Sequence, residues 1–165
     1  MSYAYFRRLN KTQKKIYLAS DKITCIELPN ANALQNSALE IKQVLPQENV
    51  VAVEACCQNL SDRLCAELKT SKPRTHVLER RPHNNYGELH GLYEPVDVGR
   101  ARGQIYVWMR TAKRQQVVAF KTFLRTLIHE FCHHLDYEYL ELADSFHTQG
   151  FFQRESSIYK QLINS

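Results

Sequence analysis

The chain has 165 residues, of which 44% are hydrophobic and 24% are charged, a balance typical of an ordinary globular domain. This length supports one self-sufficient core, so we predict a single domain over residues 1–165, with helices in 1–70 and a sheet with further helices in 71–165. The longest apolar runs are far too short for a bilayer, which excludes a membrane-spanning helix. Because the first residues contain no apolar signal segment, we expect a cytoplasmic protein.

The cysteine pattern argues against both disulfides and a cysteine-rich zinc ribbon. The count is odd, two cysteines are adjacent, and no Cys-x-x-Cys pair occurs. We therefore expect reduced thiols that pack as small hydrophobic groups. The cysteines are Cys25, Cys56, Cys57, Cys65 and Cys132.

The formal net charge is +5 at pH 7, and basic residues gather in one stretch of the chain. A basic balance favours a polyanionic partner, so contact with DNA through the region Arg100–Arg125 is one hypothesis. The alternative is an ordinary solvated surface, because most lysines and arginines serve solubility. The basic residues of this region are Arg100, Arg102, Arg110, Lys113, Arg114, Lys121 and Arg125.

The first 70 residues carry mainly helical patterns. A short basic helix is expected over 12–20. Apolar residues recur at helical spacing in 33–44, which Pro46 closes, and again in 48–68, which a Ser-Lys-Pro break follows. We therefore predict three helices before residue 70.

From residue 74 the pattern changes to one typical of strands. Residues 75–81 mix β-branched and polar residues at period two, and 84–87 have the composition of a turn. A second strand is expected over 88–93. The clearest strand in the sequence lies at 103–109. The sequence therefore predicts a small sheet in the middle of the chain.

Two helices complete the chain. Residues 116–140 read as one long helix with an apolar face, and 151–163 as a final helix after a loop. Helices, a small sheet and further helices together predict the α+β class.

The long helix contains an H-E-x-x-H motif, formed by His129, Glu130 and His133. Residues four apart lie on one helix face, so both imidazoles can bind a single zinc ion. Glu130 is turned about 100° from His129 and can reach a water on the metal. Zinc lowers the pKa of that water toward ~7, and the carboxylate can take its proton. The motif thus predicts a catalytic Zn²⁺ with Glu130 as general base.

A catalytic zinc needs a third protein ligand and one open position. His134 is turned about 100° from His133, and Asp136 is better placed to support an imidazole than to bind the metal. A metzincin would have glycine and histidine where Asp136 and Tyr139 stand, so that class is excluded. We favour His147, which lies on a loop that can fold back. The candidates weighed are His134, Asp136, Glu138, Glu141, Asp144 and His147.

The motif, followed by thirteen residues and then by His147-Thr148-Gln149-Gly150-Phe151-Phe152, resembles the SprT-like (Spartan-type) zinc metallopeptidases. The resemblance covers roughly residues 75–160 and implies a zincin-like α+β fold with a small, mostly antiparallel sheet. It implies His129, His133 and His147 as zinc ligands, Glu130 as general base, and a strand at 104–109 that lines the substrate cleft. Thr148 stands where the family usually has glycine, and the sequence contains no cysteine-rich zinc ribbon.

The sequence therefore predicts a zinc metallopeptidase that acts on a protein or peptide, with substrate paired to the backbone of 104–109 as an added strand. The family's action on DNA-associated proteins is compatible with the basic region. Arg154 and Tyr159 are candidates to stabilise the oxyanion. One alternative is a non-catalytic nucleic-acid-binding module with a structural zinc site. Another is a different zinc hydrolase, because the motif defines the metal chemistry better than the substrate.

Overall fold

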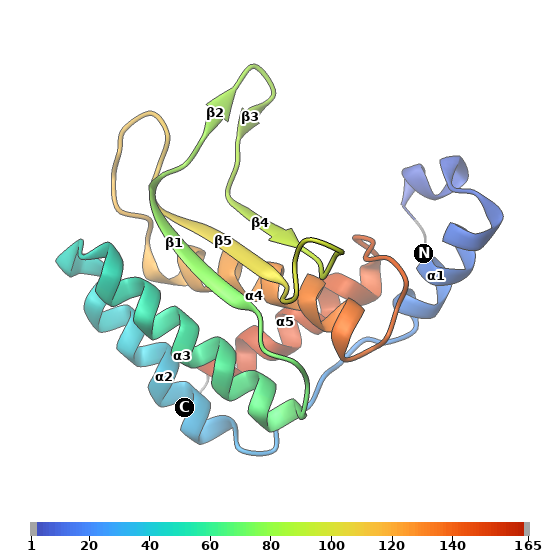
Figure 1. Ribbon diagram of the computed structural model, residues 1–165, viewed down its shortest axis with the longest axis horizontal. Helices are drawn as coiled ribbons and strands as arrows, with labels where there is room; N and C mark the ends of the chain where they lie inside the picture. The colour runs from blue at the N-terminus through green and yellow to red at the C-terminus, as the bar shows by residue number, and fades with distance from the viewer. Residues whose placement is uncertain (1–2, 164–165) are drawn as a thin grey trace.

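The computed structural model describes residues 3–163, in which helices surround one side of a small mixed sheet (Figure 1). The α-helices are α1 (Lys11–Asp21), α2 (Ala31–Val44), α3 (Val50–Leu68), α4 (Phe120–Glu138) and α5 (Gln149–Ile163), with 3-10 turns at η1 (Ala4–Arg8) and η2 (Leu45–Gln47). The strands are β1 (Arg74–Arg80), β2 (His83–Asn84), β3 (Gly87–Glu88), β4 (Gly91–Glu94) and β5 (Gln104–Arg110). The predicted α+β class is confirmed.

Local sequence explains where the early helices begin and end. The Asn10 side chain accepts a hydrogen bond from the Gln13 amide, and the Gln13 side chain accepts one from the Asn10 amide, which makes a capping box at the start of α1. The Asn49 side chain caps α3 by accepting a hydrogen bond from the Ala52 amide. Lys69 ends α3 in the left-handed conformation. The three helices predicted before residue 70 are therefore present.

The main sheet has the strand order β1-β5-β4. β4 pairs antiparallel with β5, but β1 pairs parallel with β5. The prediction of a mostly antiparallel sheet is therefore wrong for this sheet. The reason is the path of the chain, which turns back along β4 after β1 and then returns as β5 between the two. β2 and β3 form a separate two-stranded hairpin that projects from the body (Figure 1).

Two predicted elements have different limits in the structure. The strand expected over 88–93 is divided into β3 and β4. The helix expected over 116–140 begins only at Phe120, because the preceding backbone continues the sheet instead: the Val118 amide donates to the Met109 carbonyl at 2.8 Å, and the Thr111 amide donates to the Gln116 carbonyl at 2.9 Å. The apolar pattern continues through this segment, so it could not reveal the change of backbone partner.

The two outer strands of the main sheet have different edges. Side chains of α3 satisfy the β1 edge: Gln58 accepts from the Thr75 amide at 2.8 Å, and Glu54 accepts from the Val77 amide at 3.0 Å. Among the described residues, the backbone of β4 bonds to β5 and to no side chain or other element. An unpaired edge of this kind is able to accept another extended chain.

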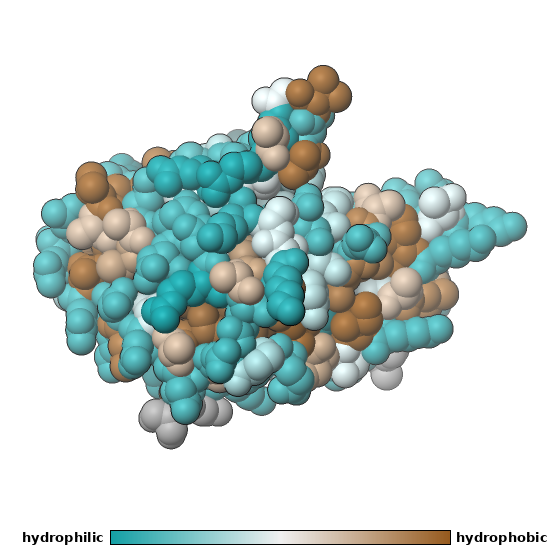
Figure 2. All heavy atoms as spheres, turned by 60° about the horizontal axis from the view of Figure 1, so that its bottom comes forward, coloured by the Kyte–Doolittle hydropathy of each residue, from teal (hydrophilic) through white to brown (hydrophobic). Residues whose placement is uncertain are grey.

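The hydrophobic core lies between the sheet and the helices. It includes buried side chains from strands and helices alike, among them Val77, Ile105, Val107, Leu64, Leu127 and Ile158. The face in Figure 2 is mostly hydrophilic, and its hydrophobic residues form small separate groups. Within residues 3–163, no helix combines the length and the apolar character that crossing a membrane requires.

Candidate metal centre

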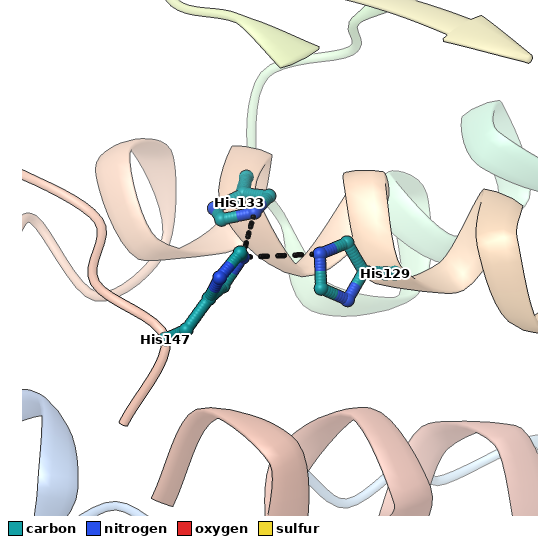
Figure 3. Close-up of side chains that lie close together, drawn as sticks. All are labelled: His129, His133 and His147. Atoms are coloured by element: carbon teal, nitrogen blue, oxygen red, sulfur yellow. Dashed lines mark hydrogen bonds between the residues drawn. The ribbon is translucent and has the colours of Figure 1, made fainter. Parts of the chain in front are cut away.

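Three imidazoles converge at one point between α4 and the loop that leads to α5 (Figure 3). His129 and His133 stand one turn apart on α4, and His147 approaches them from the loop. The Nε2 atom of His147 lies 3.1 Å from Nε2 of His129 and 2.9 Å from Nε2 of His133. The structure thus brings together the three histidines that the sequence singled out.

The outer nitrogens of the two helical imidazoles are already engaged. Nδ1 of His129 lies 2.9 Å from Oε1 of Glu155, and Nδ1 of His133 lies 2.7 Å from Oγ of Ser145. Because the carboxylate can only accept, His129 carries its proton on Nδ1 when it is neutral. Its Nε2 atom then presents a lone pair to the centre. Burial lowers the pKa of His129, but the hydrogen bond to Glu155 and the charges of Glu130 and Glu155 outweigh it and raise that pKa overall.

A chain of hydrogen bonds fixes His133 in the same way. The Ser145 hydroxyl donates to Oδ2 of Asp136 at 2.7 Å, so its lone pair is left to accept from Nδ1–H of His133. Oδ1 of Asp136 in turn accepts from Nη2 of Arg154 at 2.9 Å, and both of these charged groups are fully buried. Burial, followed by the charges of His129 and His147, lowers the pKa of His133 to about 3.

The donor set fits a zinc ion. With Nδ1 protonated on His129 and His133, both Nε2 atoms facing His147 are acceptors, and a single proton on His147 cannot satisfy both. Three imidazole nitrogens that face one another in this way are able to hold a metal cation between them. Zinc binds imidazole nitrogen at about 2.0–2.1 Å, so tetrahedral ligands lie about 3.3–3.4 Å apart. The two short separations observed here are close to that value, and all three ligand atoms lie within 4.8 Å of one another.

The other ligand candidates lie elsewhere or are occupied. His134 is buried, with Nδ1 bonded to the Tyr93 hydroxyl and Nε2 to the Ser71 carbonyl. Asp144 accepts from the Tyr137 hydroxyl and from the amide of Ser145. Among the described residues, no second group of three His, Cys, Asp or Glu side chains has metal-binding geometry, so neither Glu138 nor Glu141 belongs to one.

Glu130 lies beside the three imidazoles and lines the same cleft. It is 7% exposed. Burial raises its pKa to about 7, and the neighbouring His129 opposes that rise. Its side chain packs against Gly91 of β4, where an added Cβ would lie 2.6 Å from Oε1 of Glu130. A carboxylate with a pKa near neutrality is suited to proton transfer.

The cleft in front of the imidazoles has a volume of about 840 Å³. β4 and the residues before it form one wall, α4 forms the floor, and α5 with the His147 loop forms the opposite wall. The free edge of β4 therefore borders the candidate metal centre. The expectation that 104–109 accepts substrate as an added strand is wrong, because β5 is paired on both sides.

The two oxyanion candidates have different environments. Arg154 is fully buried and donates to the carbonyls of Ser20 and Ile23 and to Asp136, so it holds the fold together and does not reach the cleft. Tyr159 does line the cleft. Arg154 is therefore excluded as an oxyanion donor.

The first residues of the chain support the loop that carries the third histidine. The Tyr5 hydroxyl donates to the backbone carbonyl of His147 at 2.8 Å. The Gly150 amide donates to Oδ1 of Asp21 at 2.9 Å, and a Cβ on Gly150 would collide with the Asp21 carbonyl oxygen. The helical N-terminal part thus contributes to the position of His147, a role that no motif in residues 1–70 indicated.

The basic residues of 100–125 occupy more than one part of the protein. Arg100 pairs with Glu94 at one end of β5, and Arg110 pairs with Glu48 and Glu79 at the other. Arg125 lies on α4 within the cleft. DNA contact through this region stays a prediction.

No family model, curated protein or solved structure matches this chain.

Proposed function

We propose that this protein is a zinc-dependent peptidase of the SprT-like type, with a zincin-like fold. The observation that carries the proposal is the convergence of His129, His133 and His147 beside Glu130, in a cleft bordered by a free strand edge. A purely structural zinc site has no use for a buried carboxylate at the position of Glu130. The supporting contacts of His129 and His133 are typical of metal-binding histidines.

In the proposed reaction His129, His133 and His147 hold one Zn²⁺. The ion would polarise the peptide carbonyl and would lower the pKa of a water molecule, so that the water can lose a proton and attack that carbonyl. Glu130 accepts the proton of that water and passes it to the leaving amine. The burial that raises the pKa of Glu130 to about 7 favours both transfers. Tyr159 is the remaining candidate to donate a hydrogen bond to the oxyanion, because it lines the cleft.

The free edge of β4 is the place for the substrate backbone. An extended peptide paired with β4 would lie between this strand and α4, directly over the three imidazoles. Main-chain hydrogen bonds of this kind bind a peptide with little dependence on its sequence. Side-chain preference then has to come from the cleft walls.

Replacing Glu130 by Gln tests the proposal. Both proteins are loaded with zinc, and hydrolysis of fluorescently labelled denatured casein is measured beside zinc content and thermal unfolding. Loss of a general base costs about 10²–10⁴-fold in turnover. We expect the variant to keep the metal and the fold and to lose hydrolysis by that factor. Equal hydrolysis by both proteins, or none by the wild type on any peptide tested, would overturn the peptidase assignment.

The same comparison addresses the alternative of a non-catalytic module with a structural zinc site. Such a module would bind zinc, show no hydrolysis and be indifferent to the Glu130→Gln change. It would also bind DNA with a steep salt dependence. The ion pairs of Arg100 and Arg110 with glutamates leave these two residues less available to DNA phosphates, which does not favour that alternative.

A further inference from the structure

A row of side chains at four-residue spacing lines the cleft along α4. It consists of Lys121, Arg125, His129 and His133. The row therefore continues the two imidazoles with two cations. From the helical rise of 1.5 Å per residue, Arg125 lies about 6 Å and Lys121 about 12 Å from His129 along the helix axis.

Arg125 is held in a defined position. Its guanidinium carbon lies 4.1 Å from the centroid of the Tyr159 ring, and Nη1 lies 3.5 Å from Oγ of Ser156. Its ion pair with Glu155 is long, at 3.7 Å, because the other oxygen of Glu155 bonds to His129. The side chain of Arg125 is 43% exposed. With five N–H donors on the guanidinium, most of its donor capacity is available to a ligand in the cleft.

The acidic side chains in this part of the cleft are engaged elsewhere. Glu88 accepts from the amide of Ala112 and lies 3.6 Å from Arg81. Glu155 is bonded to His129 as described above. The third acidic residue of the described cleft lining, Glu130, lies against Gly91 of β4. Among the described residues, Arg125 makes only its long ion pair with Glu155, so an anionic group would be attracted to this end of the cleft.

The direction of a bound peptide follows from the direction of β4. Gly91 lies against Glu130, and Tyr93 bonds to His134 further along α4, so β4 and α4 run the same way. Antiparallel pairing is the more stable arrangement, so a peptide on the β4 edge runs the opposite way, toward Arg125 and then Lys121. At about 3.4 Å per residue, these cations meet the second and fourth residues or so beyond the cleaved bond.

We propose that Arg125 and Lys121 form a carboxylate-binding subsite that selects peptides with acidic groups on the C-terminal side of the cleaved bond. This inference rests on the proposed peptidase function. The carboxylate is either an acidic side chain or the free carboxyl end of the peptide. Arg125 is the stronger of the two contacts, because its planar guanidinium is fixed on Tyr159 and can bind a carboxylate with two donors.

Peptide binding to the zinc-loaded Glu130→Gln protein tests the subsite without any need for turnover. Fluorescein-labelled peptides of ten residues carry Glu, or Gln as control, at the second and fourth positions after the central bond, with a C-terminal amide. Hydrogen bonds to charged groups are about twice as strong as neutral ones, so we expect the Glu peptide to bind at least about tenfold more tightly. Adding Arg125→Gln removes that preference, and adding Lys121→Gln reduces it. Lys42→Gln, an exposed lysine on α2, leaves it unchanged.

A Gln peptide with a free carboxyl end at the second position identifies the source of the carboxylate. Tighter binding of this peptide than of the Glu peptide indicates a subsite for chain ends, and the reverse indicates one for acidic side chains. Equal binding of all three peptides would overturn the subsite. The subsite would also be overturned if the Arg125→Gln protein lost zinc but kept its preference for the Glu peptide. In that case the role of Arg125 would be to hold Glu155, and through it His129, in place. A charge preference in binding without hydrolysis by the wild type would refute the peptidase function and leave the subsite standing.

Discussion

Ser145 offers a test of the centre that leaves all three histidines in place. Its hydroxyl donates to Asp136 and accepts from Nδ1–H of His133, each at 2.7 Å. Replacement by Ala removes both bonds. His133 is then free to move its proton to Nε2, the nitrogen that faces the centre. We therefore predict that Ser145→Ala weakens zinc binding by its effect on one ligand.

The size of the effect follows from the contacts that are lost and kept. Loss of a group that orients a metal-binding histidine costs about 10–100-fold in metal affinity, or about 1.4–2.8 kcal/mol. Asp136 keeps its ion pair with the buried Arg154, so it is not left as an isolated charge. The loss of folding stability in the metal-free protein should therefore be smaller, about 1–2 kcal/mol.

Competition with a chromophoric zinc chelator at neutral pH measures the affinity, and urea unfolding of the metal-free proteins measures the stability. Ser145→Thr, which keeps the hydroxyl, should bind zinc nearly as well as the wild type. Ser71→Ala is the matched control, because Ser71 also donates to a carboxylate but lies away from the centre. If Ser145→Ala bound zinc as tightly as Ser71→Ala, the role assigned to Ser145 would be wrong.

Gly91→Ala should reduce hydrolysis more than zinc binding, because its new methyl group displaces Glu130. Equal hydrolysis rates for variant and wild type would show that β4 moves to make room for the methyl group and that Glu130 keeps its position. Burial raises the pKa of the Cys57 and Cys132 thiols well above their usual value, so both should resist iodoacetamide at pH 8 until the protein unfolds, as peptide mapping would reveal. The pKa of His133 is about 3 when folded and about 6.5 when unfolded. At His133 the unfolded chain binds the extra proton between these values, whereas at Glu130, with its pKa raised to about 7, the folded chain binds it down to about pH 4.3, the ordinary value of a glutamate. The two effects oppose each other above that pH, so the urea midpoint of the metal-free protein should fall between about pH 4 and pH 3.

The parts of the fold that follow from local sequence were predictable. Asn10 and Asn49 mark helix starts, and the spacing of His129 and His133 places both imidazoles on one face of α4. The spacing of the sequence did not identify His147 as the third ligand, because several acidic residues were alternative ligands. The structure favours His147 because its loop folds back onto α4.

The parts that depend on chain path were not predictable. Nothing in the strand patterns indicates that β5 lies between β1 and β4, and that order decides which strand edge is free. Glu155 and Arg154 did carry a signal, because they are charged residues within the buried stripe of α5. A charged group at such a position needs a partner. Glu155 pairs with His129 and Arg154 pairs with Asp136, and tertiary packing alone decides these partners.

The most direct test of the proposed metal centre is the zinc content of the purified wild type beside His147→Ala, determined by elemental mass spectrometry. We expect one zinc ion per chain in the wild type and a sharp loss of zinc in the variant, since two imidazoles alone hold catalytic zinc poorly. Full zinc content in His147→Ala would show that another residue is the third ligand. A wild type that takes up no zinc even when it is supplied would contradict the metal centre and the peptidase function together.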